Sequence, residues 1–328
     1  MKMMKMARDS KGIILVTGAA GRLGRMISAE FISKGYTVRA LVKDKSHILG
    51  LPAGSIPYLG DVTDRKVLLS ACKGANTVIH LAAIVTQAAE SSTSLINTNV
   101  AGTRNVVEAA KESGVKKLMF ASSVDVYGRA RREILAEHSH VQPTDLYGKS
   151  KALAEQEIIE NAGHMHYVIF RIAAIYGHGF ESSYFKILKT IREGKMSIIG
   201  AGSNRLALIY ITDVIKAFVA AVESTQRENL ILNLADGEIH TQRGLIEMAA
   251  KLLKVPTPSR HVSPLIVRML ARAKGLDSDE LRFITSDRAI DITALKDKLR
   301  FVPSVDIGTG MKRIAEMFFE RAGYPENE

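Results

Sequence analysis

The sequence holds almost no cysteine: Cys72 is the single one among 328 residues. One thiol cannot form an internal disulfide, and it cannot supply the ligands of a cysteine-based zinc site. No metal site is expected, and a reducing compartment, the cytoplasm, is the expected location. Cys72 ends an apolar stretch that begins at Val67, which predicts a buried thiol rather than a nucleophile.

Long apolar runs are also missing. The longest uncharged one extends from Thr77 to Val85, is interrupted by His80, and is far too short to cross a bilayer. The chain begins with Met-Lys-Met-Met-Lys-Met, without the apolar core or the cleavage site of a signal peptide. We therefore expect no integral membrane segment, and a disordered basic tail over residues 1–10.

The balance of charge is basic, with a formal net charge of +11. Such a charge raises the question of nucleic acid, anionic lipid or phosphate-bearing ligands. The lysines and arginines are scattered, however, and no array of interleaved aromatic residues or nucleic-acid motif accompanies them. We expect a solvated basic surface, a small-molecule substrate and no nucleic-acid partner.

Apolar segments of strand length alternate with longer segments of helical period, an order that predicts crossover units and a parallel sheet. The predicted strands are Ile13–Thr17, Thr37–Val42, Ile56–Leu59, Thr77–Leu81, Lys117–Ala121 and Tyr167–Arg171. The predicted helices are Leu23–Lys34, Arg65–Cys72, Ser94–Ser113 and Leu146–Asn161. We expect an α/β fold: a Rossmann-type doubly wound domain over 11–172, and a smaller mixed α/β substrate lobe over 173–328 that is interleaved with it.

A glycine-rich segment follows the first strand, where residues 17–24 read TGAAGRLG. Gly18 permits a tight turn, Gly21 lets the backbone approach a pyrophosphate, and Gly24 allows close packing of helix on strand. The phosphate would sit at the N-terminus of the following helix. The segment predicts dinucleotide binding by these glycines together with Arg22 and Leu23.

Basic residues surround the end of the second strand. Lys43 stands where an acidic residue would bind the ribose of NAD. Arg22, Arg39 and Lys45 are near, and basic groups at this place accept a 2′-phosphate, so NADP is favoured over NAD. NAD remains the alternative, because Asp44 would take the ribose-binding position if the strand ended one residue later than predicted.

Asp61 and Val62 come after the third strand. One interpretation places the Asp61 carboxylate and the Val62 N–H against an adenine ring. The alternative is that Asp61 caps the helix Arg65–Cys72. His80, an isolated histidine in the fourth strand, is expected to be structural.

Tyr147 and Lys151 lie four residues apart on a predicted helix, so their side chains share a face. An ammonium beside a phenol favours the phenolate and so lowers a pKa that is ordinarily about 10. Such a pair can exchange a proton with an alcohol or a carbonyl. Chance also supplies Tyr-x-x-x-Lys, so the weight of the pair depends on the accompanying motifs.

In chain order these motifs resemble those of the extended short-chain dehydrogenases/reductases. The matching segments are Thr17–Gly24, Asp61-Val62, His80–Ala83, Asn99–Thr103, Ser122–Gly128, Tyr147–Lys151 and Arg171–Gly177. The resemblance implies that Ser123, Tyr147 and Lys151 are catalytic. It also implies cofactor contacts from Leu81, Ala82, Ala83, Asn99, Tyr147, Lys151 and Ile172. Two residues have local alternatives: Ser123 could satisfy nearby backbone, and Asn99 could cap or pack its own helix.

The implied chemistry is hydride transfer at a nicotinamide ring. In the reducing direction hydride goes to a carbonyl carbon, Tyr147 protonates the developing alkoxide, and Ser123 donates a hydrogen bond to it. Oxidation runs the same steps backward.

The substrate class follows from departures within this resemblance. Nucleotide-sugar members usually carry asparagine where this chain has Ala174, and Arg-Asp where it has Leu206-Ala207. Residues 35–40, 71–80 and 122–126 look like the 3β-hydroxysteroid dehydrogenase and dihydroflavonol-reductase-like branch. We expect an apolar cyclic or long-chain secondary alcohol or ketone. The alternatives are an epimerase or dehydratase of the UDP-glucose 4-epimerase type, and a catalytically silent NAD(P)-binding protein.

Two further expectations concern surfaces. The helices Ser94–Ser113 and Leu146–Asn161 resemble those that pair in family dimers, which implies a homodimer. Residues 263–275 predict a short helix with an apolar stripe that includes Leu265, Ile266 and Met269. We expect ordinary packing of this stripe; a membrane contact or a substrate lid are the alternatives.

Overall fold

The computed structural model describes residues 10–85, 91–273 and 284–322. Of the predicted tail, residues 1–9 lie outside the described part, whereas Ser10 belongs to the folded chain. Its hydroxyl donates to Gly12 O at 2.9 Å and accepts from Thr37 N at 3.1 Å. The predicted tail is therefore wrong for Ser10.

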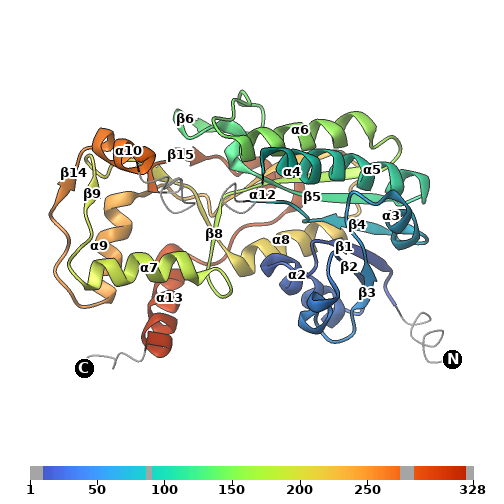
Figure 1. Cartoon of the computed structure of the whole chain (residues 1–328), viewed down its shortest axis with the longest axis horizontal. Coiled ribbons are helices and arrows are strands. Elements are labelled where there is room, and N and C mark those ends of the chain that lie inside the picture. The colour runs from blue at the N-terminus through green and yellow to red at the C-terminus, as the bar shows by residue number, and fades with distance from the viewer. Residues whose placement is uncertain (1–9, 86–90, 274–283, 323–328) are drawn as a thin grey trace. The chain divides into compact units, whose positions relative to one another are not determined.

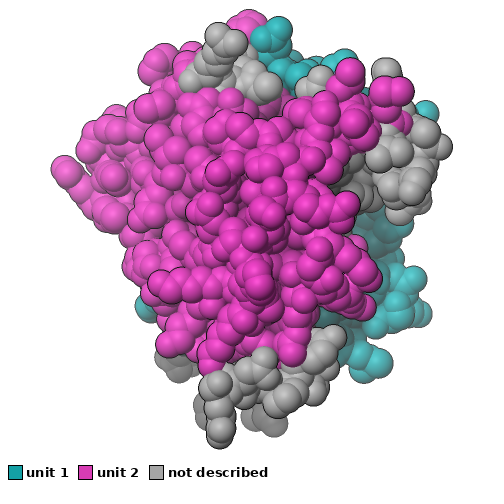
Figure 2. Space-filling view, turned by 90° about the vertical axis from the view of Figure 1, so that its left-hand side faces the viewer, with its two compact units in different colours: residues 1–128, 141–171, 215–232 teal, residues 129–140, 172–214, 233–328 magenta. Residues whose placement is uncertain are grey.

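The chain separates into two compact units, which are coloured separately in Figure 2. Unit 1 consists of residues 1–128, 141–171 and 215–232, and unit 2 of residues 129–140, 172–214 and 233–328. Each unit is thus assembled from three separate stretches of chain.

Unit 1 is built on a seven-stranded sheet in the order β12-β7-β5-β4-β1-β2-β3. These strands are β1 (Ile13–Thr17), β2 (Thr37–Val42), β3 (Ile56–Leu59), β4 (Thr77–His80), β5 (Lys117–Ser123), β7 (His166–Ile172) and β12 (Leu230–Leu234). β1 pairs in parallel with β2 on one side and β4 on the other, with Ile14 opposite Val38 and Thr77. The chain therefore winds outward in both directions from β1, and the expected doubly wound α/β fold is confirmed.

Helices cover both faces of this sheet (Figure 1). Its helical segments are α2 (Arg22–Ser33), η1 (Lys45–Gly50), α3 (Arg65–Cys72), α4 (Ser92–Ile96), η3 (Asn97–Ala101), α5 (Gly102–Glu112), η4 (Val124–Tyr127), α6 (Leu146–Asn161) and α8 (Ile211–Glu223). In Figure 1, α3, α5 and α6 lie on one face, and α2 and α8 on the other. The core under α3, α5 and α6 includes Leu68, Val107 and Ile158, all fully buried, packed on Leu15 and Leu118.

Local patterning predicted most of these elements. β1, β2, β3, α3 and α6 have the predicted bounds, and β5 runs two residues further, to Ser123. The predicted helix Ser94–Ser113 is three consecutive segments, α4, the π-helix η3 and α5. The edge strand β12 was not predicted.

Unit 2 contains short paired strands and helices, which agrees with a mixed α/β lobe. Its elements are β6 (Ala130–Leu135), β8 (Ala174–Tyr176), α7 (Glu181–Arg192), β9 (Ile198–Ile199), β10 (Arg205–Leu206), β11 (Leu208–Tyr210), β13 (His240–Thr241), α9 (Gln242–Leu252), β14 (His261–Val262), α10 (Pro264–Ala273), β15 (Asp287–Ile290), α12 (Thr293–Leu299) and α13 (Ile307–Ala322). The pairs are β10 with β13, β11 with β8, β14 with β9 and β15 with β6.

The apolar stripe of α10 is not packed as expected. Leu265, Ile266 and Met269 are 66%, 51% and 64% exposed. The expectation of ordinary packing is therefore wrong for these three side chains. Within the described residues, no helix combines the length and apolar character needed to span a membrane.

Candidate active site

The glycine turn between β1 and α2 has the close contacts that its sequence predicts. Gly18 has φ of +66°, and a Cβ there would lie 2.7 Å from the Ala82 N atom. A Cβ on Gly24 would overlap the Gly18 carbonyl oxygen. Side chains at these two positions would push the turn away from α2 and from the segment after β4.

The N-terminus of α2 suits the diphosphate of a dinucleotide. Gly21 is the N-cap residue and contributes no side-chain cap, so the first turn presents backbone N–H groups and a positive dipole end. With no Cβ at Gly21, an anion can approach the backbone directly. These features fit the dinucleotide that the sequence predicts.

Asp61 does not cap α3. Asp64 does so instead, since its carboxylate accepts from Lys66 N at 3.0 Å and from Val67 N at 3.3 Å. The capping alternative for Asp61 is therefore wrong, because Asp64, and not Asp61, directly precedes the first residue of the helix, Arg65. The adenine contact of Asp61 and Val62 stays a prediction.

Lys43 and Asp61 form an ion pair, with Nζ 3.2 Å from Oδ2. Partial burial raises the pKa of Asp61, but hydrogen bonds from Thr63 and the charge of Lys43 outweigh it and leave that pKa below its usual value. Asp44, the alternative ribose-binding acid, accepts from Ser46 N at 2.7 Å as the cap of η1. Lys43, not Asp44, is the residue that directly follows β2.

Asn99 fastens the segment after β4 to the helix that carries Tyr147 and Lys151. Its Oδ1 accepts from Ile84 N at 2.7 Å, while Nδ2 donates to Ile84 O and to Ser150 Oγ, both at 2.9 Å. Because Ile84 offers both a donor and an acceptor, the orientation of the amide is fixed. The Asn99 side chain thus bonds two other parts of the chain, and the alternative that it caps or packs its own helix is wrong. It holds the segment that includes Leu81, Ala82 and Ala83.

His80 is a buried neutral histidine with both ring nitrogens bonded. Thr103 donates its hydroxyl proton to Asn99 O at 2.6 Å, so its oxygen accepts from His80 Nε2 at 2.9 Å. His80 Nδ1 is then the acceptor for Thr17 Oγ1 at 2.7 Å. Burial and the charge of Lys151 lower the pKa of His80 to about 3. The expected structural role agrees with these contacts.

Ser123 ends β5 and caps η4. Its hydroxyl accepts from Asp125 N and donates to Asp125 Oδ2, both at 3.1 Å. The local alternative for Ser123 therefore describes its present contacts. A substrate oxygen would have to replace the Asp125 carboxylate as the acceptor of this proton.

Tyr147 and Lys151 lie one turn apart on α6, and Asp145 caps the start of that helix through Gly148 N at 2.7 Å. α6 packs against both β5 and η4, the two elements that meet at Ser123. Tyr147 is half-buried, whereas Lys151 is almost fully buried. The three predicted catalytic residues therefore come from elements in mutual contact.

The environment of Lys151 makes its charge sensitive to pH. Nζ lies 4.2 Å from the centroid of the Phe120 ring. Burial lowers the pKa of Lys151 to about 7, although the negative charge of Glu155 opposes the shift. The ammonium is thus poised to lose its proton near neutral pH.

Sequence reasoning missed a buried polar group behind this helix. Glu155, one turn beyond Lys151, forms an ion pair with Arg171 of β7 and accepts a hydrogen bond from Ser122. The signal was the i, i+4 spacing of Glu155 from Lys151, on the buried face of α6. Cys72 is buried as predicted, and burial raises its pKa to about 12.

The chain is similar to known proteins over most of its length. Residues 14–235 match the model of the NAD dependent epimerase/dehydratase family. The chain is 29% identical to N-acetyl-alpha-D-glucosaminyl-diphospho-ditrans,octacis-undecaprenol 4-epimerase of Escherichia coli O157:H7, over 76% of this chain and 75% of that protein. It is 26% identical to UDP-glucose 4-epimerase of Vibrio cholerae, over 94% and 95%.

Other relatives are dehydrogenases. A 3-beta-hydroxysteroid dehydrogenase of Mycolicibacterium neoaurum is 25% identical over 66% of this chain and 62% of its own length. Among solved structures, UDP-glucuronic acid 4-epimerase from Bacillus cereus in complex with NAD has a TM-score of 0.76 at 22% identity, covering 95% of this chain and 99% of that one. The family match, the sheet order and the glycine turn lead to one conclusion: the chain belongs to the NAD dependent epimerase/dehydratase family, within the extended short-chain dehydrogenases/reductases.

Proposed function

We propose that this enzyme interconverts a secondary alcohol and a ketone by hydride transfer, with Ser123, Tyr147 and Lys151 as its catalytic residues. The observation that carries the proposal is the packing of α6, with Tyr147 and Lys151 one turn apart, against the β5–η4 junction at Ser123. Proton transfer between a tyrosine hydroxyl and a substrate oxygen is the chemistry that such a group supplies.

Ser123, Tyr147 and Lys151 have different roles in the proposed reaction. A bound nicotinamide would supply or accept the hydride. Tyr147 gives its phenolic proton to the substrate oxygen during reduction, and takes it back during oxidation. Lys151, when charged, favours the phenolate of Tyr147, and Ser123 donates a hydrogen bond to the developing alkoxide.

For the cofactor we propose NADP, with Lys43 receiving the 2′-phosphate. Lys43 directly follows β2 and its side chain is 76% exposed, while Asp44 is engaged as the cap of η1. The Asp61 carboxylate at 3.2 Å competes for the same ammonium. NADPH and NADH titrations measured by fluorescence test this directly; tenfold tighter binding of NADH would refute it.

For the substrate we propose an apolar cyclic or long-chain alcohol or ketone. Ala174 has no side-chain amide for a diphosphate, and its backbone N–H donates to Ala207 O at 3.2 Å. Arg205, the first basic residue ahead of the Tyr210-x-x-Asp213 motif, is paired with Asp287, with Nε 2.7 Å from Oδ1. An anionic substrate would have to break that pair to bind Arg205.

A second candidate, a sugar epimerase, is favoured by one observation. The similarity to UDP-glucose 4-epimerase of Vibrio cholerae extends over 94% of this chain and 95% of that protein, whereas the similarity to the Mycolicibacterium dehydrogenase covers 66% and 62%. An epimerase uses the same proton relay twice and returns the hydride to its substrate.

A substrate panel separates the two candidates. Cyclic ketones, long-chain secondary alcohols and UDP-sugars are each incubated with the enzyme and either nicotinamide cofactor. The first two are followed by nicotinamide absorbance, and the sugars by chromatographic identification of the product. Turnover of a ketone or alcohol supports the apolar substrate; epimerisation of a UDP-sugar without net cofactor change contradicts it. No turnover of any compound would favour the silent NAD(P)-binding protein.

We also propose a homodimer that pairs through α5 and α6. Leu153 and Ile159 of α6 are each 44% exposed, which leaves apolar surface on a helix of the expected interface. Light scattering at micromolar concentration tests the proposal, and a monomer there would contradict it.

A further inference from the structure

A buried ion pair joins α6 to β7 in unit 1. Arg171 Nη2 lies 2.7 Å from Glu155 Oε2, and Arg171 Nε lies 3.1 and 3.2 Å from the two carboxylate oxygens. The side chains of Arg171 and Glu155 are only 5% and 4% exposed. Placing two charges out of water is costly, and such a pair often stabilises a fold no better than apolar residues of similar volume would. Stability alone therefore does not explain why the ion pair lies at this place.

The same ion pair holds both ends of the segment that contains Ser123. At one end, Ser122 Oγ donates to Glu155 Oε1. At the other end, Arg171 Nη1 donates to the Tyr127 hydroxyl at 2.9 Å, and the guanidinium lies 4.9 Å from the centroid of the Tyr127 ring. Of the five residues from Ser123 to Tyr127, the first follows a residue bonded to Glu155, and the last is itself bonded to Arg171.

The middle of this segment rests on α6 itself. A Cβ on Gly148 would lie 2.6 Å from the Asp125 carbonyl oxygen, so the helix approaches the backbone of η4 closely at the residue after Tyr147. Glu155 lies one turn beyond Lys151 and two beyond Tyr147 on the same helix. Any movement of α6 would therefore carry Glu155, Tyr147 and Lys151 with it.

We propose that Ser122, Tyr127, Glu155 and Arg171 form a clamp of positioning residues that sets the distance between Ser123 and Tyr147. The inference rests on the proposed function of those two residues, and it adds a role for groups that touch neither substrate nor cofactor. Catalysis needs the two hydroxyls on the same substrate oxygen, and a misplacement of about 1 Å can cost about a hundredfold in rate.

Charge supports the arrangement. Arg171 compensates the Glu155 carboxylate, so a negative group can remain buried one turn from Lys151. The Glu155 charge opposes the fall in the pKa of Lys151 that burial causes. Glu155 thus favours the charged ammonium at the site and also accepts the hydrogen bond from Ser122.

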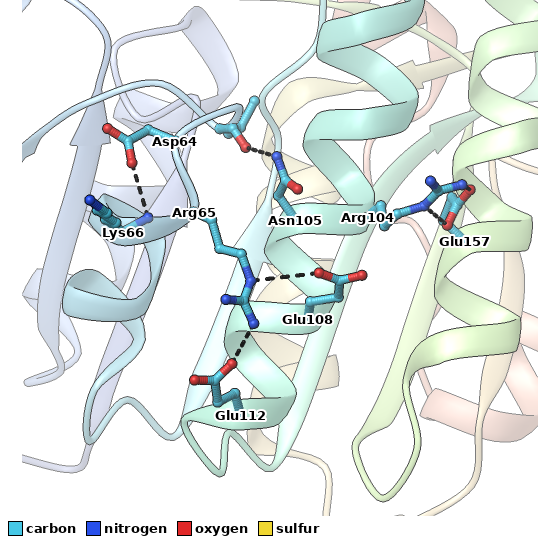
Figure 3. A network of polar contacts seen from close by, with 9 residues as sticks. Asp64, Arg65, Lys66, Arg104, Asn105, Glu108, Glu112 and Glu157 are labelled. Atoms are coloured by element: carbon cyan, nitrogen blue, oxygen red, sulfur yellow. Dashed lines mark hydrogen bonds and ion pairs between the residues drawn. The ribbon is translucent and has the colours of Figure 1, made fainter.

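The test uses two variants that leave the ion pair in place. Ser122→Ala releases one end of the segment, and Tyr127→Phe releases the other. Glu157→Gln is the matched control, because Glu157 is on the same helix but pairs with Arg104 of α5, at 2.5 Å (Figure 3). Each protein is saturated with NADPH, and hydrogen exchange of the amides in 122–128 is measured by mass spectrometry.

We expect faster exchange over 122–128 in Ser122→Ala and Tyr127→Phe, and no change in Glu157→Gln. With cyclohexanone or UDP-glucose as the probe substrate, kcat should fall about tenfold in each single variant and about a hundredfold in the double variant, while the Kd of NADPH stays unchanged. Unchanged exchange in the two variants would overturn the clamp. So would a lower Tm with unaltered kcat per folded enzyme, since that pattern marks a merely structural role.

Failure of the proposed function has a different signature. If Tyr147→Phe keeps full activity, the catalytic assignment is wrong, while hydrogen exchange still decides whether the clamp holds the segment. If Tyr147→Phe is inactive and the clamp variants keep full kcat, the catalytic assignment stands and the clamp fails.

Discussion

Gly148 lies so close to Asp125 that a Cβ on the glycine would be 2.6 Å from the Asp125 carbonyl oxygen and 3.1 Å from its carbon. Both contacting atoms belong to backbone, so a rotamer change cannot relieve the overlap. The sequence position next to Tyr147 makes this contact the point where α6 meets the segment of Ser123.

Gly148→Ala should destabilise the protein and slow it. Alanine gains about 1 kcal/mol of helix propensity over glycine, but overpacking against fixed backbone costs about 1–3 kcal/mol. We expect a lower Tm and a lower kcat, measured by thermal unfolding and nicotinamide absorbance. Lys149→Ala, an exposed substitution on the same helix, should change neither. A Gly148→Ala enzyme with the wild-type Tm and kcat would show that the close approach is dispensable.

The pH dependence of kcat/KM should report Lys151. Its pKa in the free enzyme is lowered to about 7, chiefly by burial, so the ammonium is lost as pH rises through that value. We therefore expect kcat/KM to fall above about pH 7. Lys151→Arg keeps its charge at every accessible pH, so this fall should disappear even if the maximal rate is lower. Persistence of the same fall in Lys151→Arg would assign it to another group.

His80 should make the fold sensitive to acid. Its pKa is about 3 in the folded protein against 6.5 ordinarily, so between these values the unfolded chain binds a proton that the folded chain does not. His80 does not change the free energy of unfolding above pH 6.5. Between pH 6.5 and about pH 3 its titration lowers that free energy by about 1.4 kcal/mol for each pH unit.

Urea unfolding of His80→Gln at pH 7 and pH 5 measures this linkage. The wild-type free energy of unfolding should fall by about 2 kcal/mol more than that of His80→Gln over this interval. His164→Gln, at an exposed position, serves as the control and should lose stability as the wild type does. An equal fall in the wild type and in His80→Gln would mean that His80 titrates alike in both states.

The Lys43–Asp61 pair should set the choice between the two cofactors. Asp61→Asn removes the carboxylate that lies 3.2 Å from the Lys43 ammonium, which leaves that cation for a 2′-phosphate. We expect the NADPH-to-NADH affinity ratio to rise, by at most about fivefold because the lysine is exposed. Lys43→Glu should lower the ratio. Using the ratio cancels any adenine contact of Asp61, which both cofactors share. A ratio that neither variant alters would remove Lys43 from cofactor selection.

The parallel sheet could be predicted because its signals are local. The strands around Leu15, Val38 and Val78 are short apolar runs, and glycines or helical periods separate them. β12 was missed because it lies after the alternation loosens, and its place beside β7 depends on pairing between distant segments. Long-range pairing of this kind has no signature in a single segment.

In the candidate site, too, the residues with local sequence signals were predicted and those that depend on distant partners were not. Spacing predicted the pair of Tyr147 and Lys151, the strand and helix that flank Gly18 predicted its role, and the resemblance implied that of Ser123. The clamp could not be predicted, because Glu155 and Arg171 are 16 positions apart and on different elements. The sequence alone does not distinguish a buried charged residue from a solvent-exposed one, because the difference depends on which residues surround it in the fold.

The decisive measurement is the turnover of Tyr147→Phe beside its binding of NADPH. The variant loses one hydroxyl and keeps the ring, so α6 and the Ser123 segment should fold as before. We predict that the variant still binds NADPH but loses turnover on every substrate that the wild-type enzyme converts, because no proton reaches the alkoxide. Retained turnover with intact cofactor binding would contradict the assignment of Tyr147 as the proton donor and, with it, the proposed mechanism.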